Sequence, residues 1–190
     1  MLTGIYGGSF NPIHYAHIRL AKALLRQTML DEIWFVVSPQ NPLKQDSALL
    51  DDDKRLELTR LALRRVPGLS VSDVEFQLPR PSYMHTTLTY LAEQHPDRQF
   101  VLIIGADNWE RFHLWHRADD IIARFPIIVY PRPGSPIDAN SLPPTVRLVD
   151  TPLIPISSTL IRQRIKQGKS IDRLVPRAVA RIIREEGLYL

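Results

Sequence analysis

The chain has 190 residues, of which 44% are hydrophobic and 23% charged, and its formal net charge is +4. This length can bury a sizeable core within one domain, and the composition is not that of a disordered or fibrous protein. The absence of cysteine excludes disulfides and thiolate metal sites, so any metal would depend on histidine, carboxylate or a bound phosphate.

The N-terminal residues lack a charged leader followed by an apolar stretch, and no apolar run approaches the ~18 residues of a membrane span. We therefore predict a soluble cytoplasmic protein that does not bind membranes. The positive net charge favours anionic partners, among which nucleotides, nucleic acids and acidic lipids are all candidates; a basic surface that only meets solvent is the alternative.

Short apolar runs alternate with amphipathic stretches over the first two thirds of the chain. The runs are rich in β-branched and aromatic residues and predict buried parallel strands at 2–6, 32–37, 99–104 and 127–130. Apolar residues at three-to-four spacing predict helices at 16–27, 52–65 and 86–95. This alternation indicates an α/β parallel sheet with helices on both faces, in which ligands bind at the carboxyl ends of the strands.

The last third of the chain has a different character. Prolines are frequent in residues 131–155, which predicts an extended surface loop around a short strand at 146–149. Two short helical patterns follow within 156–190, with Gly168 and Gly187 at C-cap positions. We expect a single domain over 1–190, made of a core at 1–155 and a small C-terminal helical appendage at 156–190.

The sequence GGSFNPIHYAH follows the first predicted strand. Gly7 and Gly8 let backbone N–H groups approach a ligand, but the spacing matches neither the dinucleotide-binding turn nor the lysine-containing phosphate loop. His14 and His17 would project from one side of the first turn of the next helix, beside the positive end of its dipole.

Three interpretations of this histidine pair are open: a metal site, a phosphate contact, or two ordinary histidines. A metal would need further ligands such as Asn11, His113 or His116, none of which gives a recognised zinc spacing. The segment ISSTLIR favours phosphate, because hydroxyls, free N–H groups and a guanidinium at a helix start suit a polyphosphate, although a serine N-cap with a surface arginine would look the same.

Taken together, YGGSFNPIHYAH and ISSTLIR resemble the G-G-x-F-D-P-x-H-x-G-H and I-S-S-T-x-I-R signatures of the nucleotidyltransferase superfamily. The segments NPLK, RPSY, IIGADNW, LWHRADDI, PRPG and LVPRAVARIIREEGLYL are similar, in the same order, to those of bacterial nicotinate mononucleotide adenylyltransferase. The resemblance covers nearly the whole chain. Phosphopantetheine adenylyltransferase is the nearest alternative within the superfamily.

The resemblance implies a Rossmann-like fold and an enzyme of NAD biosynthesis. The implied reaction joins ATP and nicotinate mononucleotide to give deamido-NAD (nicotinate adenine dinucleotide) and pyrophosphate. It would proceed by direct in-line attack without a covalent enzyme intermediate. Mg²⁺ would be the cofactor, held by phosphates and not by protein side chains.

The resemblance also implies roles for individual residues in ATP binding. His14 and His17 would contact the phosphates, with His17 closest to the α-phosphate, and Arg162 would be the third catalytic residue. The other implied ATP contacts are Gly7, Gly8, Ser9 and Phe10 in the first loop, Gly105 and Asp107 at the ribose, Arg132 near the adenine, and Ser157, Ser158 and Thr159 at the β- and γ-phosphates. An N-cap role is the alternative for Asp107.

The implied contacts to nicotinate mononucleotide are Lys44 at its phosphate, Trp115 stacking on the pyridine ring, and Tyr83, Met84 and His85 near the nicotinate carboxylate. Three residues depart from the family pattern: Asn11 replaces an aspartate, Ala16 a glycine, and Met84 a threonine. Because Met84 has no hydroxyl, selectivity for acid over amide would rest on backbone N–H groups of 83–85, and a preference for nicotinamide mononucleotide is an alternative.

Two other classes of protein are alternatives. A nucleic-acid-binding module would use a basic helical stripe of Arg173, Arg177, Arg181 and Arg184, but Glu185, Glu186 and the lack of a reader motif argue against nucleic acid as partner. A histidine-metal hydrolase would use His14 and His17 as ligands. The sequence leaves open whether the protein forms a homo-oligomer and whether the loops at 39–50 and 131–145 close on substrate.

Overall fold

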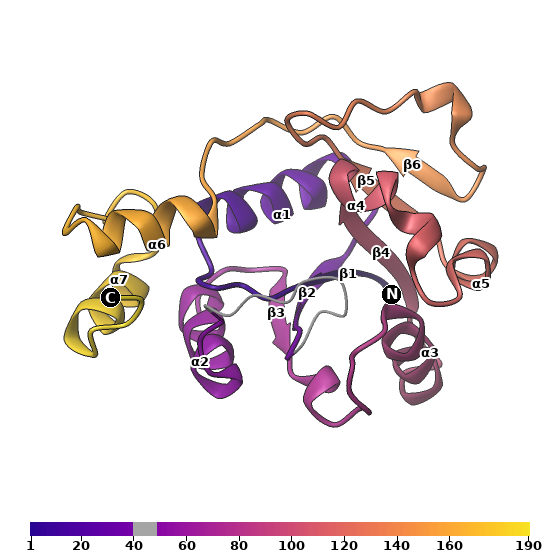
Figure 1. The fold of residues 1–190 in the computed structure, drawn as a ribbon. Helices are drawn as coiled ribbons and strands as arrows, with labels where there is room; N and C mark the ends of the chain where they lie inside the picture. Colours follow the sequence, from indigo (N-terminus) through magenta and orange to yellow (C-terminus); the bar gives the residue numbers. More distant parts are fainter. Residues whose placement is uncertain (40–48) are drawn as a thin grey trace.

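The computed structural model describes residues 1–39 and 49–190. Its described strands form one parallel sheet in the order β3-β2-β1-β4-β5-β6 (Figure 1). The strands are β1 Leu2–Gly8, β2 Glu32–Val37, β3 Leu69–Ser72, β4 Gln99–Gly105, β5 Ile127–Tyr130 and β6 Val146–Leu148. This is the doubly wound Rossmann-like order, whose winding direction reverses between β1 and β4. The predicted fold class is confirmed.

All five predicted strands are present, and their ends differ from the predicted ones by at most two residues. The β1 strand runs on to Gly8, which pairs with Val37, so both glycines belong to the strand and not to the loop after it. The sequence reading missed β3, because LSVS is only four residues long and two of them are serines. This strand pairs with β2 alone at the edge of the sheet.

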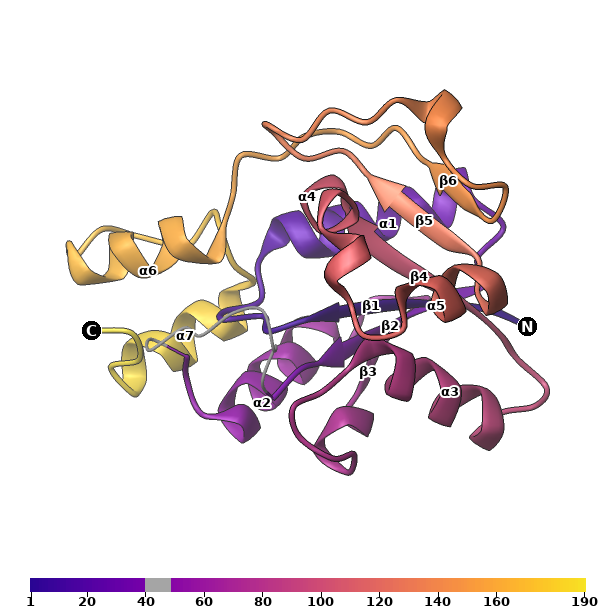
Figure 2. The same cartoon turned by 45° about the vertical axis from the view of Figure 1, so that its right-hand side comes forward.

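The pleat of the strands divides the core between the two faces of the sheet. Tyr6 and Phe35 belong to one buried cluster, whereas their neighbours Ile5 and Val36 belong to the other. The helices α1 Tyr15–Gln27 and α2 Asp52–Leu63 pack on the first cluster. The second cluster is covered by α3 Met84–Gln94, α4 Ala106–Glu110 and α5 Ala118–Arg124, which lie in front of the sheet in Figure 2.

The predicted helices at 16–27, 52–65 and 86–95 correspond to α1, α2 and α3. The largest differences are two residues each: α2 stops at Leu63, before the predicted end, and α3 begins at Met84, before the predicted start. The short helices α4 and α5 and the 3₁₀ turns Val74–Phe76, Phe112–Leu114 and Ala139–Ser141 were not predicted. Elements this short contain at most two helical turns, so they carry little apolar periodicity.

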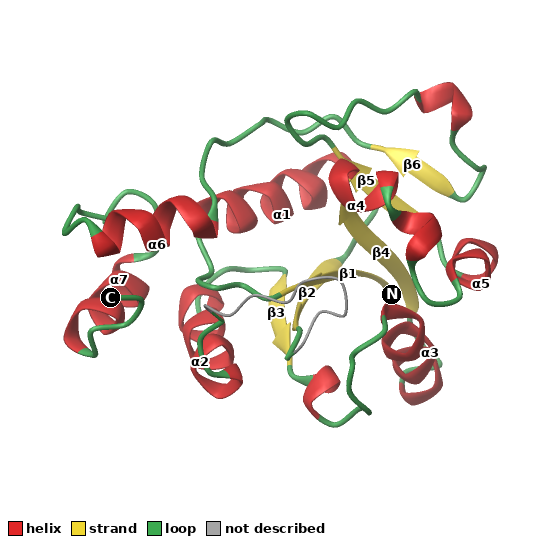
Figure 3. Ribbon diagram, in the orientation of Figure 1, coloured by secondary structure: helices red, strands yellow, loops and turns green. Residues whose placement is uncertain are grey.

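The C-terminal segment forms α6 Ser158–Lys166 and α7 Arg177–Glu185 (Figure 3). Gly168 and Gly187 adopt φ values of +63° and +62°, and the N–H groups of the residues after them bond back to Arg164 and Ile183. Both helices therefore end in the glycine caps that the sequence predicts. Val179, Ala180 and Ile183 of α7 join the same buried cluster as α1 and α2, so the appendage shares the core of that face.

The basic stripe expected at the C-terminus is only partly helical. Arg173 precedes α7, while the side chains of Arg184 and Arg181 pair with Asp172 and Glu185 at 2.6 and 3.9 Å. The two chain termini lie at opposite ends of the molecule in Figure 2. Within the described part of the chain, no helix has the length and apolar character needed to cross a bilayer.

Candidate active site

The loop between β1 and α1 is anchored by Phe10. This residue is 2% exposed, and its ring packs edge-on against Tyr6 and tilted against Phe35, with centroids 5.7 and 5.3 Å apart. A Cβ on Gly8 would lie 3.0 Å from the Phe10 ring, so a glycine is needed for this close approach. Phe10 has a φ of +45°, which costs a non-glycine residue energy that burial of its ring offsets. Its ring is in the core, so only its backbone remains for a ligand.

His14 and His17 form one unit at the start of α1. His14 is the N-cap, and its backbone N–H donates a hydrogen bond of 3.3 Å to Nδ1 of His17. The two rings stack with their centroids 3.6 Å apart. Because Nδ1 of a neutral His17 accepts this bond, its proton is on Nε2, which then serves as a donor. The cap therefore fixes both the orientation and the tautomer of His17.

His14 is the more buried member of the pair. It is 4% exposed, and burial together with the positive charge of Arg132 lowers its pKa to about 3. Its Nδ1 is buried and has no hydrogen-bond partner among the described residues. His14 is consequently neutral at neutral pH and can act only as a neutral hydrogen-bonding group.

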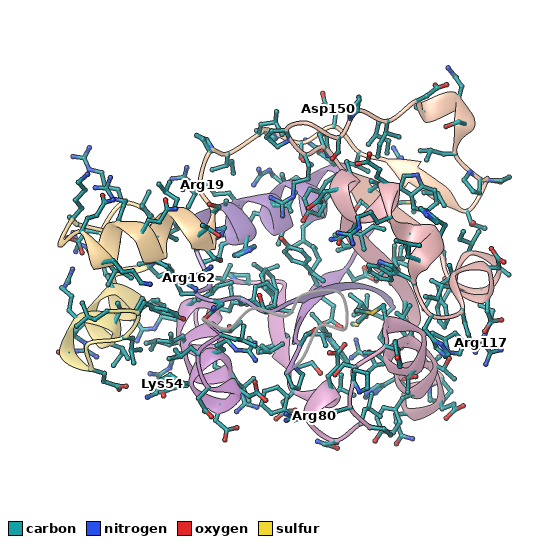
Figure 4. All side chains as sticks on the ribbon, viewed as in Figure 1. Arg19, Lys54, Arg80, Arg117, Asp150 and Arg162 are labelled. Atoms are coloured by element: carbon teal, nitrogen blue, oxygen red, sulfur yellow. The ribbon has the colours of Figure 1, made fainter. Side chains whose placement is uncertain are left out.

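The ISSTLIR segment lies against this loop, as the resemblance implies. The Ser158 hydroxyl donates to the carbonyl oxygen of Pro12 at 3.0 Å, and Nη1 of Arg162 donates to that of Asn11 at 2.8 Å. In Figure 4 Arg162 projects from α6 toward the centre of the molecule. Ser157 caps α6 by accepting from the N–H of Leu160 at 3.1 Å, so the serine N-cap that was the alternative interpretation of this segment is present.

Asn11, the replacement for the usual aspartate, has a structural partner. It is 1% exposed, and its Oδ1 accepts a hydrogen bond of 3.2 Å from the N–H of Leu50. An aspartate could accept the same bond but would bring a buried negative charge. Asparagine therefore keeps this acceptor without placing a charge beside the loop.

Gly105, Asp107 and Arg132 meet at the carboxyl ends of β4 and β5. Oδ1 of Asp107 lies 3.5 Å from Nε of Arg132. A Cβ on Gly105 would collide with the Asp107 carboxylate and lie 3.0 Å from Nε of Arg132, so the glycine makes room for this ion pair. The N-cap of α4 is Gly105, and Asp107 makes no capping bond, so the alternative of an N-cap aspartate is wrong.

Two cavities open at this edge of the sheet. The first, of about 110 Å³, is lined by Gly7, Gly8, Met84, Gly105 and Trp115 among others, and the second, of about 50 Å³, by His14, His17, Arg132 and residues 151–154. Tyr6 and Tyr130 line both cavities, and their hydroxyl oxygens are 3.5 Å apart. These two buried tyrosines therefore form the wall between the cavities.

The predicted site residues divide between these cavities and their surroundings. Tyr83, Met84 and Trp115 line the first cavity, but the His85 side chain points to Asp120, with Nε2 and Oδ2 2.5 Å apart. Lys44 lies outside the described residues, as does most of the loop at 39–50. The predicted ATP contacts that line neither cavity are Ser9, Phe10, Asp107, Ser157, Ser158, Thr159 and Arg162.

The sequence reading did not identify Arg55, a completely buried arginine on α2. Its guanidinium donates to the carbonyl oxygens of Ser9, Ser38 and Leu50 at 2.6, 2.9 and 3.0 Å. It also pairs with Asp52 at 2.5 Å. Arg55 thus ties the ends of β1 and β2 together. One feature of the sequence could have indicated its burial. Arg55 directly precedes Leu56 and lies on the apolar side of the helix predicted at 52–65.

The metal interpretation of the histidines finds no geometric support. Over residues 1–39 and 49–190, no group of three or more His, Asp or Glu side chains could hold a metal ion. His113 is exposed, and the His116 ring packs against Tyr83 with centroids 4.6 Å apart. The donors beside the first loop are imidazoles, hydroxyls and guanidinium groups, which suit an anion.

Comparison with known proteins agrees with this geometry. The sequence model of the cytidylyltransferase-like family matches residues 5–164. Relatives from Bacteroides thetaiotaomicron and Cytophaga hutchinsonii, both named probable nicotinate-nucleotide adenylyltransferase, are 50% and 42% identical over 96% and 100% of this chain and 91% and 98% of their own.

A solved structure of Plasmodium falciparum nicotinic acid mononucleotide adenylyltransferase complexed with NaAD has the same fold. It is 21% identical, with a TM-score of 0.83 over 99% of this chain and 97% of that one. The fold, the two motifs and the identity to curated relatives lead to one conclusion: the chain belongs to the cytidylyltransferase-like family and, within it, to the nicotinate-nucleotide adenylyltransferases.

Proposed function

We propose that the enzyme transfers the adenylyl group of ATP to nicotinate mononucleotide, giving deamido-NAD and pyrophosphate in NAD biosynthesis. The observation that supports this most is the direct contact between the segments GGSFNPIHYAH and ISSTLIR. Ser158 and Arg162 of α6 bond to the backbone of Pro12 and Asn11, two and three residues before His14. The hydroxyl and guanidinium donors of α6 thus bond to the loop that leads to His14 and His17, and these two histidines line the second cavity.

The two cavities suit the two substrates. The first carries the aromatic side chains of Trp115 and Tyr83 and takes the pyridine ring of nicotinate mononucleotide. The second carries His14, His17 and Arg132 and takes the adenosine end of ATP, with Asp107 at its ribose. Gly7, Gly8 and Gly105 lie on the first cavity, where their missing side chains let the ribose phosphates approach the backbone.

The reaction is a displacement at the α-phosphorus of ATP. A phosphate oxygen of nicotinate mononucleotide forms the new P–O bond, and the bond from the α-phosphorus to the α,β-bridging oxygen breaks. Pyrophosphate leaves with that electron pair, so the protein forms no covalent intermediate. The protein contributes alignment of two anionic substrates, which can supply up to ~7–11 kcal/mol, and donors placed along the triphosphate.

The donors have distinct roles in this proposal. His17 presents Nε2–H to the α-phosphate, because its Nδ1 is occupied by the His14 N–H. His14, neutral and stacked on His17, supports that orientation and adds a neutral hydrogen bond. Arg162, Ser158 and the N–H groups at the start of α6 hold the β- and γ-phosphates, where the departing charge develops.

The family implies Mg²⁺, and the residues at the site fit a metal carried by the substrate. No carboxylate cluster converges at the loop within the described chain. The phosphates of ATP would supply the oxygen ligands, and His14, His17 and Arg162 would orient those phosphates. When bound, Mg²⁺ neutralises charge on the departing pyrophosphate.

The experiment is pyrophosphate release from ATP with nicotinate mononucleotide, nicotinamide mononucleotide or phosphopantetheine offered separately, with each product identified by mass. We expect efficient formation of deamido-NAD. Turnover with phosphopantetheine alone would place the enzyme in a different subfamily. Metal-washed protein should also lack stoichiometric zinc; tightly bound zinc would contradict the role given to His14 and His17.

A further inference from the structure

The first cavity has a polar floor that the adenylyl-transfer chemistry does not use. Its described lining is mostly apolar and aromatic, yet it includes Glu75, from the 3₁₀ turn Val74–Phe76 between β3 and α3. Glu75 is the one carboxyl group among the described lining residues, and it is 1% exposed. A buried carboxyl in an apolar cavity is costly unless it has a partner or is neutral.

One oxygen of Glu75 is satisfied and the other is not. The hydroxyl of Thr87, on α3, donates to Oε1 at 2.9 Å. Oε2 is buried and makes no hydrogen bond of standard geometry within the described chain, although the hydroxyls of Ser38 and Ser82 stand beside the carboxyl. Both serines line the same cavity. The cavity therefore contains a carboxyl group with one oxygen available to a ligand.

The protonation state of Glu75 follows from its burial. Desolvation raises the pKa of Glu75, and the hydroxyls of Ser38, Thr87 and Ser82 offset this only in part. When Glu75 is protonated with the proton on Oε2, that atom is a hydrogen-bond donor, while Oε1 keeps the bond from Thr87. A neutral buried carboxylic acid can donate to an anionic ligand.

We propose that Glu75 is a specificity-determining residue that distinguishes nicotinate from nicotinamide mononucleotide. Protonated Glu75 donates to the nicotinate carboxylate, whereas ionised Glu75 repels that carboxylate and accepts from an amide. This rests on the proposed function, and it assigns to Glu75 the selectivity for which Met84 offers no hydroxyl. The ring would lie between Trp115 and Met84, with its substituent toward Glu75.

Other titratable groups that face the cavity are His116 on the loop before α5, Tyr83 at the start of α3, and Tyr6 and Tyr130 on β1 and β5. Burial raises the pKa of Tyr6 and of Tyr130, so both stay protonated at neutral and mildly alkaline pH. His116 is the one cavity-lining group of the described chain that can carry positive charge. The contribution of His116 to the pH dependence of substrate preference must be separated from that of Glu75.

The test is the ratio of kcat/KM for nicotinate mononucleotide to kcat/KM for nicotinamide mononucleotide, measured between pH 5 and 9. The two substrates share their phosphate, so its titration and that of the ATP site cancel in the ratio. We expect the ratio to fall about ten- to hundred-fold as pH rises and Glu75 ionises, as for loss of one hydrogen bond to a charged group. The fall begins once pH approaches the raised pKa of Glu75.

Glu75→Gln keeps an acceptor for Thr87 and replaces Oε2 with a permanent amide donor. We expect this variant to fold and to show a ratio of kcat/KM values that no longer falls as pH rises. Asp73→Asn is the matched control, since Asp73 enters the same turn but pairs with Arg60 at 2.7 Å on the surface. For Asp73→Asn, the ratio of the two kcat/KM values should change with pH as it does in wild type.

His116→Gln completes the design. The proposal is supported if the fall of the substrate ratio with rising pH persists in His116→Gln and vanishes in Glu75→Gln. The reverse result overturns it. A pH-independent ratio in the wild type, or an unchanged profile in Glu75→Gln, also overturns it while leaving the adenylyl transfer itself intact. If neither pyridine nucleotide binds in titration calorimetry, the proposed function and this inference both fail.

Discussion

Nη1 of Arg162 donates a hydrogen bond of 2.8 Å to the carbonyl oxygen of Asn11, a residue 151 positions away in the sequence. Together with the bond from Ser158 to Pro12, it seats the N-terminus of α6 beside the loop that carries His14 and His17. In the proposed function, the dipole of this helix, the guanidinium and the imidazoles all act on one triphosphate. Neither motif forms this site without the other.

His17→Ala should lower kcat about 10²- to 10³-fold, the cost of losing one donor to the transition state. His17→Gln should retain more activity than His17→Asn, because a glutamine amide reaches the position of Nε2 and an asparagine amide that of Nδ1. Steady-state kinetics with saturating substrates measure this. A loss under threefold for His17→Ala, with an unchanged circular dichroism spectrum, would remove His17 from its proposed role.

His14 should make the protein less stable as the pH falls from about 6.5 toward 3. Its folded-state pKa of about 3 lies below the ordinary histidine pKa of 6.5, so between these values the unfolded chain binds a proton that the folded protein does not. Above pH 6.5 both states are unprotonated and His14 contributes no pH dependence.

Urea unfolding at pH 6.5 and pH 4.5 measures this effect. Over those two pH units, wild type should lose about 2–3 kcal/mol more of unfolding free energy than His14→Gln. His113→Gln is the control, because His113 is exposed on the 3₁₀ turn Phe112–Leu114. Equal pH dependence in wild type and His14→Gln would contradict the neutral, buried state of His14.

Arg55→Met should destabilise the protein by about 3–5 kcal/mol and weaken ATP turnover. The substitution leaves the carbonyl oxygens of Ser9, Ser38 and Leu50 without their donor and leaves Asp52 without its buried partner. Thermal and urea unfolding measure the loss.

The neighbouring residue provides the control for Arg55. Lys54 bridges Glu57 and Glu186 at the surface, labelled in Figure 4, and Lys54→Met should change stability little because exposed ion pairs contribute little. If Arg55→Met and Lys54→Met lost similar amounts of unfolding free energy, the stabilising role given to the buried hydrogen bonds of Arg55 would be wrong.

Met84→Thr should increase the preference for nicotinate mononucleotide by up to about tenfold, because it adds a hydroxyl to the wall of the first cavity. It also removes the methyl group that lies over Gly7, where a Cβ would be 2.7 Å from Cε of Met84. KM for ATP should stay unchanged. Met29→Thr, at a position 86% exposed, is the control; an unchanged preference in Met84→Thr would place the substrate carboxylate elsewhere.

The strands and the phosphate motif could be predicted because their signals are local. A run such as EIWFVV is apolar throughout, and a strand buried on both faces needs only that, so β2 follows from its own residues. Ser157 caps α6 and Gly168 ends it through bonds within a few residues. The edge strand β3 was missed because half of its residues are serines.

The role of Gly105 could be predicted only in part from its motif. The family resemblance gives it the role of leaving room for the ribose, whereas in this fold its missing side chain also makes room for Asp107 and Arg132. Arg132 comes from the loop after β5, so the contact depends on the register of two strands, which no local pattern contains.

By itself the sequence determined the fold class, the family and the segments that form the candidate active site, because apolar periodicity, capping residues and motif spacing are properties of neighbouring residues. Only the tertiary structure decided which polar side chains are buried. Arg55 and Glu75 look like ordinary residues in the sequence, and the motif that contains His14 does not reveal that its side chain is buried. Burial depends on atoms brought from distant parts of the chain, and it is burial that gives these side chains their altered hydrogen bonding and pKa values.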